Sequence, residues 1–225
     1  MATTVVFSSG PFSSDLARRA LRGHVPDRVV VADGGLATCV AAGLTADVVV
    51  GDMDSVDPIQ LAAAERSGAQ IMRHPQDKDA TDLELALELA LDPAPDRLVV
   101  VGSASGRLDH LLAWAVLVGS PRLADLVVEA WMGDTCVLPV HAGAPRRVLG
   151  SRGGVVTLLA LHGPATGVHT DGLRWPLGGE VLEPGSTRGV SNQFTDTEAR
   201  VAVGSGVVTV VVPDADGQKS DGATA

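Results

Sequence analysis

Tyrosine is absent from this chain of 225 residues, and aromatic residues make up only 3% of it. The core therefore has to be built from Val, Leu and Ala, which is feasible because 45% of the residues are hydrophobic. No apolar run approaches the roughly 18 residues that a membrane span needs, so we expect no membrane partner. Three Trp residues stand out against so aromatic-poor a background.

Basic residues are also scarce, with 17 Lys and Arg against 27 Asp and Glu, and the formal net charge is −10. This balance argues against nucleic acid as the main partner, because no basic surface is evident. It favours a cationic small molecule, and it disfavours free ATP unless a metal masks the phosphates. Two isolated cysteines and a start without the basic region of a signal peptide predict a reduced, cytoplasmic setting.

The chain shows two different sequence patterns, and the first extends to about residue 132. Short β-branched runs alternate there with Ala- and Leu-rich segments, which predicts an α/β domain with a mainly parallel, Rossmann-like sheet. The expected strands are Thr4–Ser8, Arg28–Ala32, Asp47–Val50, Gln70–Arg73, Leu98–Val101 and Leu126–Trp131. The expected helices are Ser14–Arg22, Pro58–Ser67, Asp82–Leu91 and Leu108–Leu117.

After Gly133 the helical period disappears, and short strands recur between Gly, Pro and Thr residues. This pattern predicts a C-terminal all-β sandwich. We therefore expect domains at 1–132 and 133–213, followed by a polar, disordered tail at 214–225. The boundary should fall within 133–146, where Pro and Gly cluster.

Aspartates follow the ends of successive predicted strands in the first domain. Ligands of open α/β sheets sit at the carboxyl ends of the strands, so these acids should share one edge. Their mutual repulsion is relieved most simply by a divalent cation, and oxygen-only ligands that also meet phosphates favour Mg²⁺. Lys78 and Arg107 would supply positive charge for phosphate oxygens. The acids are Asp33, Asp52, Asp54, Asp79, Asp82 and Asp109.

Each of these motifs also has a simpler interpretation. Asp33-Gly34-Gly35 could be only a tight turn, although glycines also let the backbone approach a ligand. Thr81 could cap the helix that starts at Asp82, with Glu84 completing a capping box. Arg107 and Asp109 could be a surface pair. Their coincidence on successive strand ends is what predicts a metal–polyphosphate site.

The ordered set of motifs resembles thiamine pyrophosphokinases. In the first half the resemblance is carried by four stretches, and in the second half by two more. The first four are Ala32–Gly35, Gly51–Ser55, Lys78–Asp82 and Gly106–His110; the other two are Gly172–Leu177 and Gly189–Phe194. Met53 and Gln193 depart from the residues that are usual in the family.

The resemblance implies a domain for ATP, a sandwich that binds thiamine, and a homodimer with its site between domains of opposing subunits. It implies Mg²⁺ ligands at Asp52, Asp54 and Asp82, with Asp33 nearby. It places Thr81, Arg107 and Asp109 around the nucleotide and its phosphates, where the strand-end argument also leads us to expect Asp33, Gly34, Gly35 and Lys78. On the thiamine side it places Trp175, Ser191 and Asn192.

The implied reaction is attack of the thiamine hydroxyl on the β-phosphorus of ATP, with release of AMP. Asp79 and Asp109 are the candidate bases. An indole at Trp175 suits the thiazolium or the pyrimidine of thiamine, although this ring could instead fill the sandwich core. Trp114 lies in an apolar helix, and we expect it in the core.

Other functions remain open at this point. Phosphatases that use the first Asp of an Asp-x-Asp as nucleophile normally carry it after the first strand, whereas Asp52 follows the third. A nucleotide-sugar glycosyltransferase would not explain the Arg107 or Trp175 motifs. Another Mg²⁺-dependent phosphotransferase, or a non-catalytic regulator that binds thiamine or nucleotide, stays as an alternative.

Overall fold

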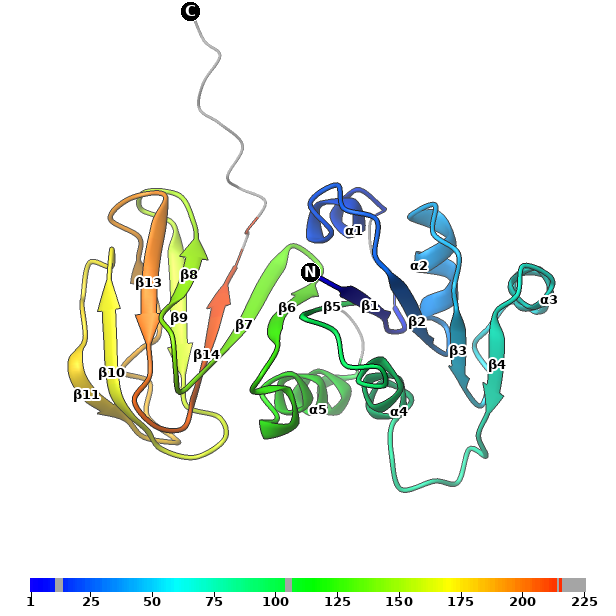
Figure 1. Ribbon diagram of the computed structural model, residues 1–225. Coiled ribbons are helices and arrows are strands. Elements are labelled where there is room, and N and C mark those ends of the chain that lie inside the picture. Colours follow the sequence, from blue (N-terminus) through cyan, green and yellow to red (C-terminus); the bar gives the residue numbers. More distant parts are fainter. Residues whose placement is uncertain (11–13, 104–106, 214, 216–225) are drawn as a thin grey trace, which may run out of the picture. The chain divides into compact units, whose positions relative to one another are not determined.

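The computed structural model describes residues 1–10, 14–103, 107–213 and 215. The chain divides into two compact units (Figure 1). The first comprises Met1–Leu117 and Asp125–Gly133, and the second comprises Val118–Ala124 and the chain from Asp134 onward. The predicted tail falls outside the described residues except for Ala215, whose N–H donates to the carbonyl of Asp134. The predicted domain limits stay predictions.

The first unit contains strands β1 to β6, and every neighbouring pair among them is parallel. Val-rich strands such as β1 and β5 are buried throughout, because the sheet is covered on both faces. In spatial order the strands are β6 (Val127–Met132), β5 (Arg97–Gly102), β1 (Thr3–Phe7), β2 (Arg28–Ala32), β3 (Val48–Gly51) and β4 (Gln70–Arg73).

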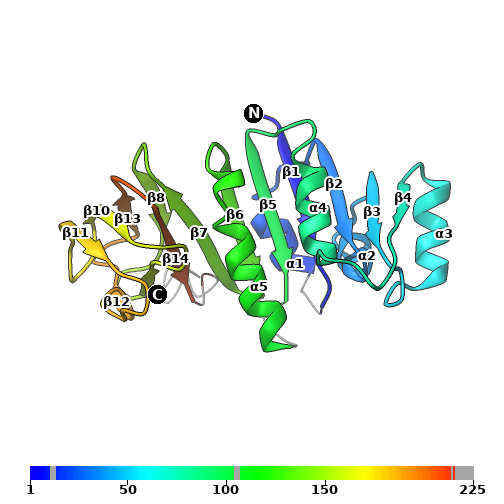
Figure 2. The same cartoon turned by 90° about the horizontal axis from the view of Figure 1, so that it is seen from below.

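Helices connect these strands and cover the sheet. Within the first unit, α4 and α5 lie over one face and α1 and α2 over the other (Figure 2). The short helix α2 is absent from the sequence prediction. None of the described helices is long and apolar enough to cross a membrane. The helices are α1 (Ser14–Ala20), α2 (Gly35–Ala41), α3 (Pro58–Arg66), α4 (Asp82–Ala90) and α5 (Leu108–Val118), with a 3₁₀ turn η1 at Pro121–Leu123.

The strand order reverses at β1, which has β2 on one side and β5 on the other. The chain leaves β1 in one direction and returns beside it only after β4, so the connections diverge there. Ser8, just past β1, donates its backbone N–H to the Val101 carbonyl at 2.8 Å and keeps the two strand ends together. Open α/β sheets bind ligands at such a point, outside the carboxyl ends of the strands.

The second unit is a sandwich of two antiparallel sheets, which Figure 1 shows as neighbouring layers. Buried and exposed residues alternate along β9 and β13, as expected for strands with one face toward a core. One sheet contains β12 (Asn192–Gln193), β9 (Val155–Leu159), β14 (Val207–Val212) and β7 (Thr135–His141). The other contains β11 (Gly178–Leu182), β10 (Ala165–Asp171), β13 (Glu198–Ala202) and β8 (Arg146–Leu149). The predicted fold class is confirmed.

One strand that the sequence analysis did not predict lies in the segment where we expected the domain boundary. Strand β7 lies within 133–146 and pairs along its length with β14. Pro139 sits inside this strand, opposite Thr209. A proline is tolerated wherever the ladder does not need its missing N–H, and composition cannot show where that is.

Candidate functional site

A cavity of about 610 Å³ opens at the carboxyl edge of the parallel sheet, and all its walls belong to the first unit. Its polar end is formed by the loops that follow β2 and β3 and by the start of α4. Its other end is formed by the ends of β1 and β5 and by one side of α5. Four of the six acids and both basic residues singled out in the sequence therefore meet around one space.

Asp33 is placed by a tight turn between β2 and α2. Its backbone has the unusual φ of 43°, and its N–H donates to the Val50 carbonyl at 2.8 Å. At Gly35 a Cβ would lie 2.5 Å from the Phe7 carbonyl oxygen, so only glycine lets α2 start this close to β1. Asp33 is buried, and its Oδ2 accepts a hydrogen bond from Ser55. The sequence motif is thus a tight turn that also fixes an inward-facing acid.

The loop after β3 holds Asp52 close to Asp33. Gly51 has a φ of 149°, and a Cβ there would approach the Asp33 Cβ to 2.9 Å and Asp82 Oδ1 to 3.1 Å. Asp52 Oδ1 accepts the backbone N–H of Asp54 at 3.1 Å, which folds the loop over itself. The absence of a side chain at Gly51 is therefore what allows three acids to crowd together.

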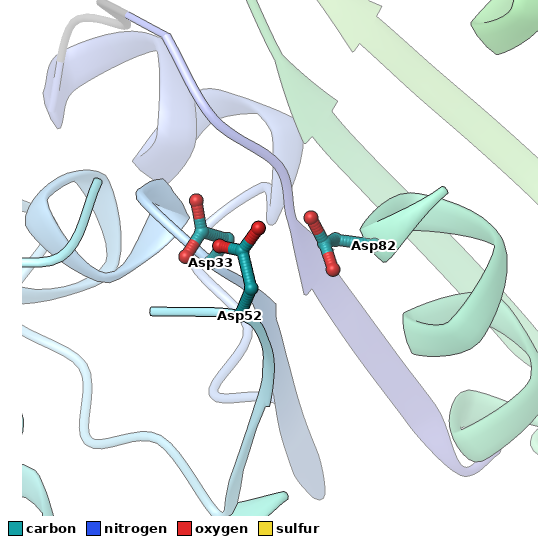
Figure 3. A group of neighbouring side chains, drawn as sticks. All are labelled: Asp33, Asp52 and Asp82. Carbon is teal, nitrogen blue, oxygen red and sulfur yellow. The ribbon is translucent and has the colours of Figure 1, made fainter. Parts of the chain in front are cut away.

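Figure 3 shows the carboxylates of Asp33, Asp52 and Asp82 turned toward one another. One oxygen from each lies within 4.8 Å of the others. Oxygens around one Mg²⁺ are at most about 4.2 Å apart, twice the metal–oxygen distance, so a small approach would complete a ligand set. Asp33 Oδ1, on a side chain that is 5% exposed, has no hydrogen-bond partner among the described residues. A buried carboxylate oxygen left without a partner fits a cation ligand.

Asp54, predicted as the third metal ligand, lies outside this group of three, and Asp33 stands in its place. It lines the same cavity, where its Oδ2 accepts a hydrogen bond from Gln76 at 3.3 Å. Repulsion by Asp52, the largest cause, and by Asp33 and Asp82 raises the pKa of the Asp54 carboxyl. All four acids therefore share one electrostatic environment, while the ligand role of Asp54 stays a prediction.

Lys78 and Thr81 lie at the start of α4, beside Asp82. Thr81 caps the helix, since its hydroxyl accepts the Glu84 N–H at 3.2 Å, as the simpler interpretation predicted. Lys78 Nζ lies 3.1 Å from Asp82 Oδ1 and 3.2 Å from the Pro75 carbonyl oxygen. Both side chains also line the cavity, so helix capping and a place in the site coexist.

Arg107 lines the cavity from just before α5 and forms a two-pronged ion pair with Asp109, at 3.1 and 2.6 Å. The side chains are 72% and 61% exposed, so the surface-pair interpretation describes this contact. The hydrogen bond from Arg107 lowers the pKa of the Asp109 carboxyl. Neither Asp109 nor Asp79 is among the described residues that line the cavity.

Several cavity residues escaped the sequence analysis. Ser8, Ser9 and Gly10 follow the end of β1, so the same strand-end rule could have found them. Trp114 is 5% exposed, which confirms its expected burial, but one side of it also lines the cavity. The helical spacing that marks a core residue cannot distinguish a core from a cavity wall.

In the second unit, Trp175 is 53% exposed, so the alternative that it fills the sandwich core is wrong. Buried Asn192 fixes its backbone: Asn192 Oδ1 accepts the Trp175 N–H at 3.1 Å, and Asn192 Nδ2 donates to the Trp175 carbonyl at 2.7 Å. The guanidinium of Arg174 lies 4.9 Å from the centre of the indole ring. Ser191, with a φ of 58°, is held by the Thr157 hydroxyl through its N–H.

Gln193, one of the departures from the family pattern, has a local partner. Its Oε1 accepts a hydrogen bond from the Arg174 guanidinium at 2.9 Å, and its carbonyl accepts the Arg174 N–H at the same distance. The neutral amide therefore still orients the arginine that covers Trp175.

The parallel sheet with a carboxylate-lined cavity at its carboxyl edge defines an α/β protein that binds its ligand outside the strand ends, and a β-sandwich accompanies it. The family model described as the catalytic domain of thiamin pyrophosphokinase matches residues 25–122. The model described as the vitamin B1 binding domain of thiamin pyrophosphokinase matches residues 147–208. The chain belongs to the thiamine pyrophosphokinase family.

Individual relatives agree with this assignment. A thiamine pyrophosphokinase of Bacillus subtilis is 35% identical over 80 residues, which are 36% of this chain and 37% of that protein. Thiamine pyrophosphokinase 1 of Oryza sativa is 25% identical over 175 residues, 73% of this chain and 65% of that protein. These alignments thus span less than two thirds of either curated relative. The crystal structure of the Bacillus subtilis enzyme has the same fold, with a TM-score of 0.78 at 20% identity over 93% of this chain and 98% of that one.

Proposed function

We propose that this chain is a Mg²⁺-dependent thiamine pyrophosphokinase, which transfers the diphosphate of ATP to the hydroxyl of thiamine and releases AMP. The observation that carries the proposal is the union of two matches on one chain. The catalytic-domain model covers the acids that line the cavity, and the vitamin B1 binding model covers the exposed Trp175 with its buried support Asn192.

The polyphosphate would lie along the acidic end of the cavity. Asp33, Asp52 and Asp82 would hold Mg²⁺, and Asp54 joins them in our proposal because its charge already interacts with all three. When bound, Mg²⁺ supplies charge neutralisation for the phosphate oxygens. The protein's own work in such a transfer is positioning and electrostatic stabilisation, for which Lys78 and Arg107 are suited.

The transfer needs one proton removed from thiamine. The hydroxyl oxygen would form a bond to the β-phosphorus while the bond from that phosphorus to the bridging oxygen of AMP breaks. Asp79 and Asp109 stay the candidate bases. Asp109 is the weaker candidate, because Arg107 stabilises its ionised carboxylate and already donates hydrogen bonds to both of its oxygens. A base of low pKa is a poor proton acceptor.

Thiamine itself would be recognised in the second unit. Its cationic thiazolium or flat pyrimidine would stack on the exposed Trp175 ring. It would either displace the Arg174 guanidinium from the ring or share the ring with it. Ser191 and Asn192 complete this side of the proposal. Our proposal also includes a homodimer and a cytoplasmic location. Light scattering on the purified protein measures the oligomeric state directly.

The test is a direct assay with purified protein, thiamine, ATP and Mg²⁺, followed by chromatography. We expect equal amounts of AMP and thiamine diphosphate. Formation of ADP with thiamine monophosphate would show transfer of a single phosphate and contradict the proposal. Tight binding of both substrates with no product would favour the non-catalytic regulator.

A further inference from the structure

Lys78 lines the cavity, and its ammonium lies against one of the acids. Its Nζ is 3.1 Å from Asp82 Oδ1, and the two side chains are only 14% and 26% exposed. The second contact of the ammonium is the Pro75 carbonyl oxygen at 3.2 Å. Both partners belong to the protein, so the charge of Lys78 is committed within the chain before any ligand arrives.

The acidic end of the cavity needs such a charge. Asp33, Asp52, Asp54 and Asp82 bring four carboxylates to one place. Within the described part of the chain, Lys78 makes the only ion pair with any of the four. Crowded carboxylates disfavour their own ionised forms, and one ammonium at contact distance offsets part of that repulsion.

The contact between Lys78 and Asp82 is an ion pair without the alignment of a hydrogen bond. Asp82 Oδ1 has no hydrogen-bond partner among the described residues, although the ammonium lies 3.1 Å away, because the alignment of a hydrogen bond is missing. Asp33 Oδ1 is in the same condition, on a deeply buried side chain. These two oxygens belong to the residues that come within 4.8 Å of each other and of Asp52. The ammonium thus balances charge at the carboxylate that a cation would need, so a cation bound there would have to displace it.

We infer that Lys78 is the internal counter-ion of the metal-free cavity: its ammonium stays on Asp82 until a divalent cation takes that carboxylate, and then turns to the polyphosphate. This inference rests on the metal site of the proposed function. Two cations at one carboxylate repel each other, and the flexible four-carbon stem of lysine lets the ammonium leave. Metal loading and phosphate recognition are thereby coupled through one side chain.

Metal binding without nucleotide or thiamine tests this inference. Free Mn²⁺ is measured by electron paramagnetic resonance in titrations of metal-stripped wild-type protein and of Lys78→Met. We expect Lys78→Met to bind Mn²⁺ roughly three- to tenfold more tightly, as removal of a competing ion pair of moderate strength predicts. Arg107→Met is the matched control. It removes the same charge from the same cavity, but the partner of Arg107 is Asp109 and none of the four crowded acids. The affinity of this variant for Mn²⁺ should change less than about twofold.

A second pair of variants separates direct competition from a general charge effect. In the Asp82→Asn background, Lys78→Met should no longer tighten Mn²⁺ binding, because the shared carboxylate is gone. Equal tightening in both backgrounds would overturn the inference, as would unchanged or weaker binding by Lys78→Met in the wild-type background. If Asp82→Asn binds too weakly to titrate, equal tightening by Lys78→Met and Arg107→Met is the overturning result. Circular dichroism melts establish that each variant is folded.

The metal site itself can fail separately. Wild-type protein that binds no Mn²⁺ at millimolar concentration would contradict the metal ligands of the proposed function, and the inference would fall with them. Wild-type binding with an unresponsive Lys78→Met leaves the metal site intact and removes only the counter-ion role.

Discussion

The acids of the first unit and the tryptophan of the second are held in opposite ways. Asp33 is buried at a positive φ. The acids around it come together at Gly51, where a side chain would collide with Asp33 and Asp82. At Trp175 the backbone is the fixed part, through the buried amide of Asn192, while the ring is 53% exposed. The first arrangement suits a small ion of fixed geometry, and the second presents a flat surface to a ring.

The comparison predicts different costs of mutation. A change among the acids should abolish the reaction while leaving stability nearly intact, because like charges in the folded state oppose folding. A change at Trp175 should weaken one substrate and leave the chemistry otherwise alone. Four predictions test this division, and the first has the largest expected effect.

Asp52→Asn should lower kcat/KM at least about a thousandfold, because a ligand charge is lost while the side-chain shape is kept. The amide oxygen can still accept the Asp54 N–H, so the loop should keep its fold. The melting temperature should stay within about 2 °C of wild type. Asp77→Asn, an exposed acid on the neighbouring loop outside the cavity lining, is the control and should retain activity within about twofold. Comparable losses in both variants would contradict the metal assignment.

Gly51→Ala should reduce activity about a hundredfold and destabilise the protein by roughly 1–3 kcal/mol. The new Cβ would press against Asp33 and Asp82, and the φ of 149° is unfavourable for alanine. Gly43→Ala is the matched control, since its φ is also positive, at 77°, but no atom lies within 4 Å of the new Cβ. Gly43→Ala should lose about 1 kcal/mol of stability with normal kinetics. Urea unfolding and steady-state kinetics on both variants measure the difference, and similar kinetics would show that crowding of the acids is unimportant.

Much of this contrast could be predicted from the sequence, for physical reasons. Buried parallel strands are continuous Val-rich runs, so β1, β2 and β3 were visible, and the acids that follow them had to share an edge. The strand-end rule does not say which acid turns inward. Asp33 does so because its backbone adopts a positive φ, and nothing in the residue order announces that.

The misses have equally specific causes. Helix α2 is short and contains Thr and Val, so its period was too weak to recognise. Strand β7 contains Pro139, which interrupts its β-branched pattern, and Trp114 shares its helical spacing with core residues although it also lines the cavity. Exposure of Trp175 depends on Asn192, 17 residues further along the chain, and local patterns do not report contacts at that separation.

Trp175→Ala should raise the KM for thiamine about tenfold or more and leave the KM for ATP within about twofold, because a cation–π contact is worth roughly 1–2 kcal/mol. The free energy of unfolding should barely change, since the ring is already more than half exposed. Trp175→Phe should recover part of the affinity, because a smaller aromatic face remains. Equal increases in both KM values, or a large loss of stability, would show that the ring supports the structure instead of binding thiamine.

The smallest effect is expected at Cys39 in α2, the helix that follows the Asp33 turn. Burial, with a smaller contribution from Asp47, raises the pKa of the Cys39 thiol from 9.0 to about 12. Above pH 9 the unfolded chain releases this proton while the folded chain keeps it. The free energy of unfolding should therefore fall by at most about 1.4 kcal/mol per pH unit between pH 9 and 12, and this site should contribute little pH dependence below about pH 8. Urea unfolding of wild type and Cys39→Ala at pH 8, 9 and 10 isolates the contribution: the stability difference between them should shrink slightly from pH 8 to 9 and by about 1 kcal/mol more from pH 9 to 10. A difference that stays constant up to pH 10 would mean that the Cys39 thiol is less buried in the folded protein than the packing of α2 indicates.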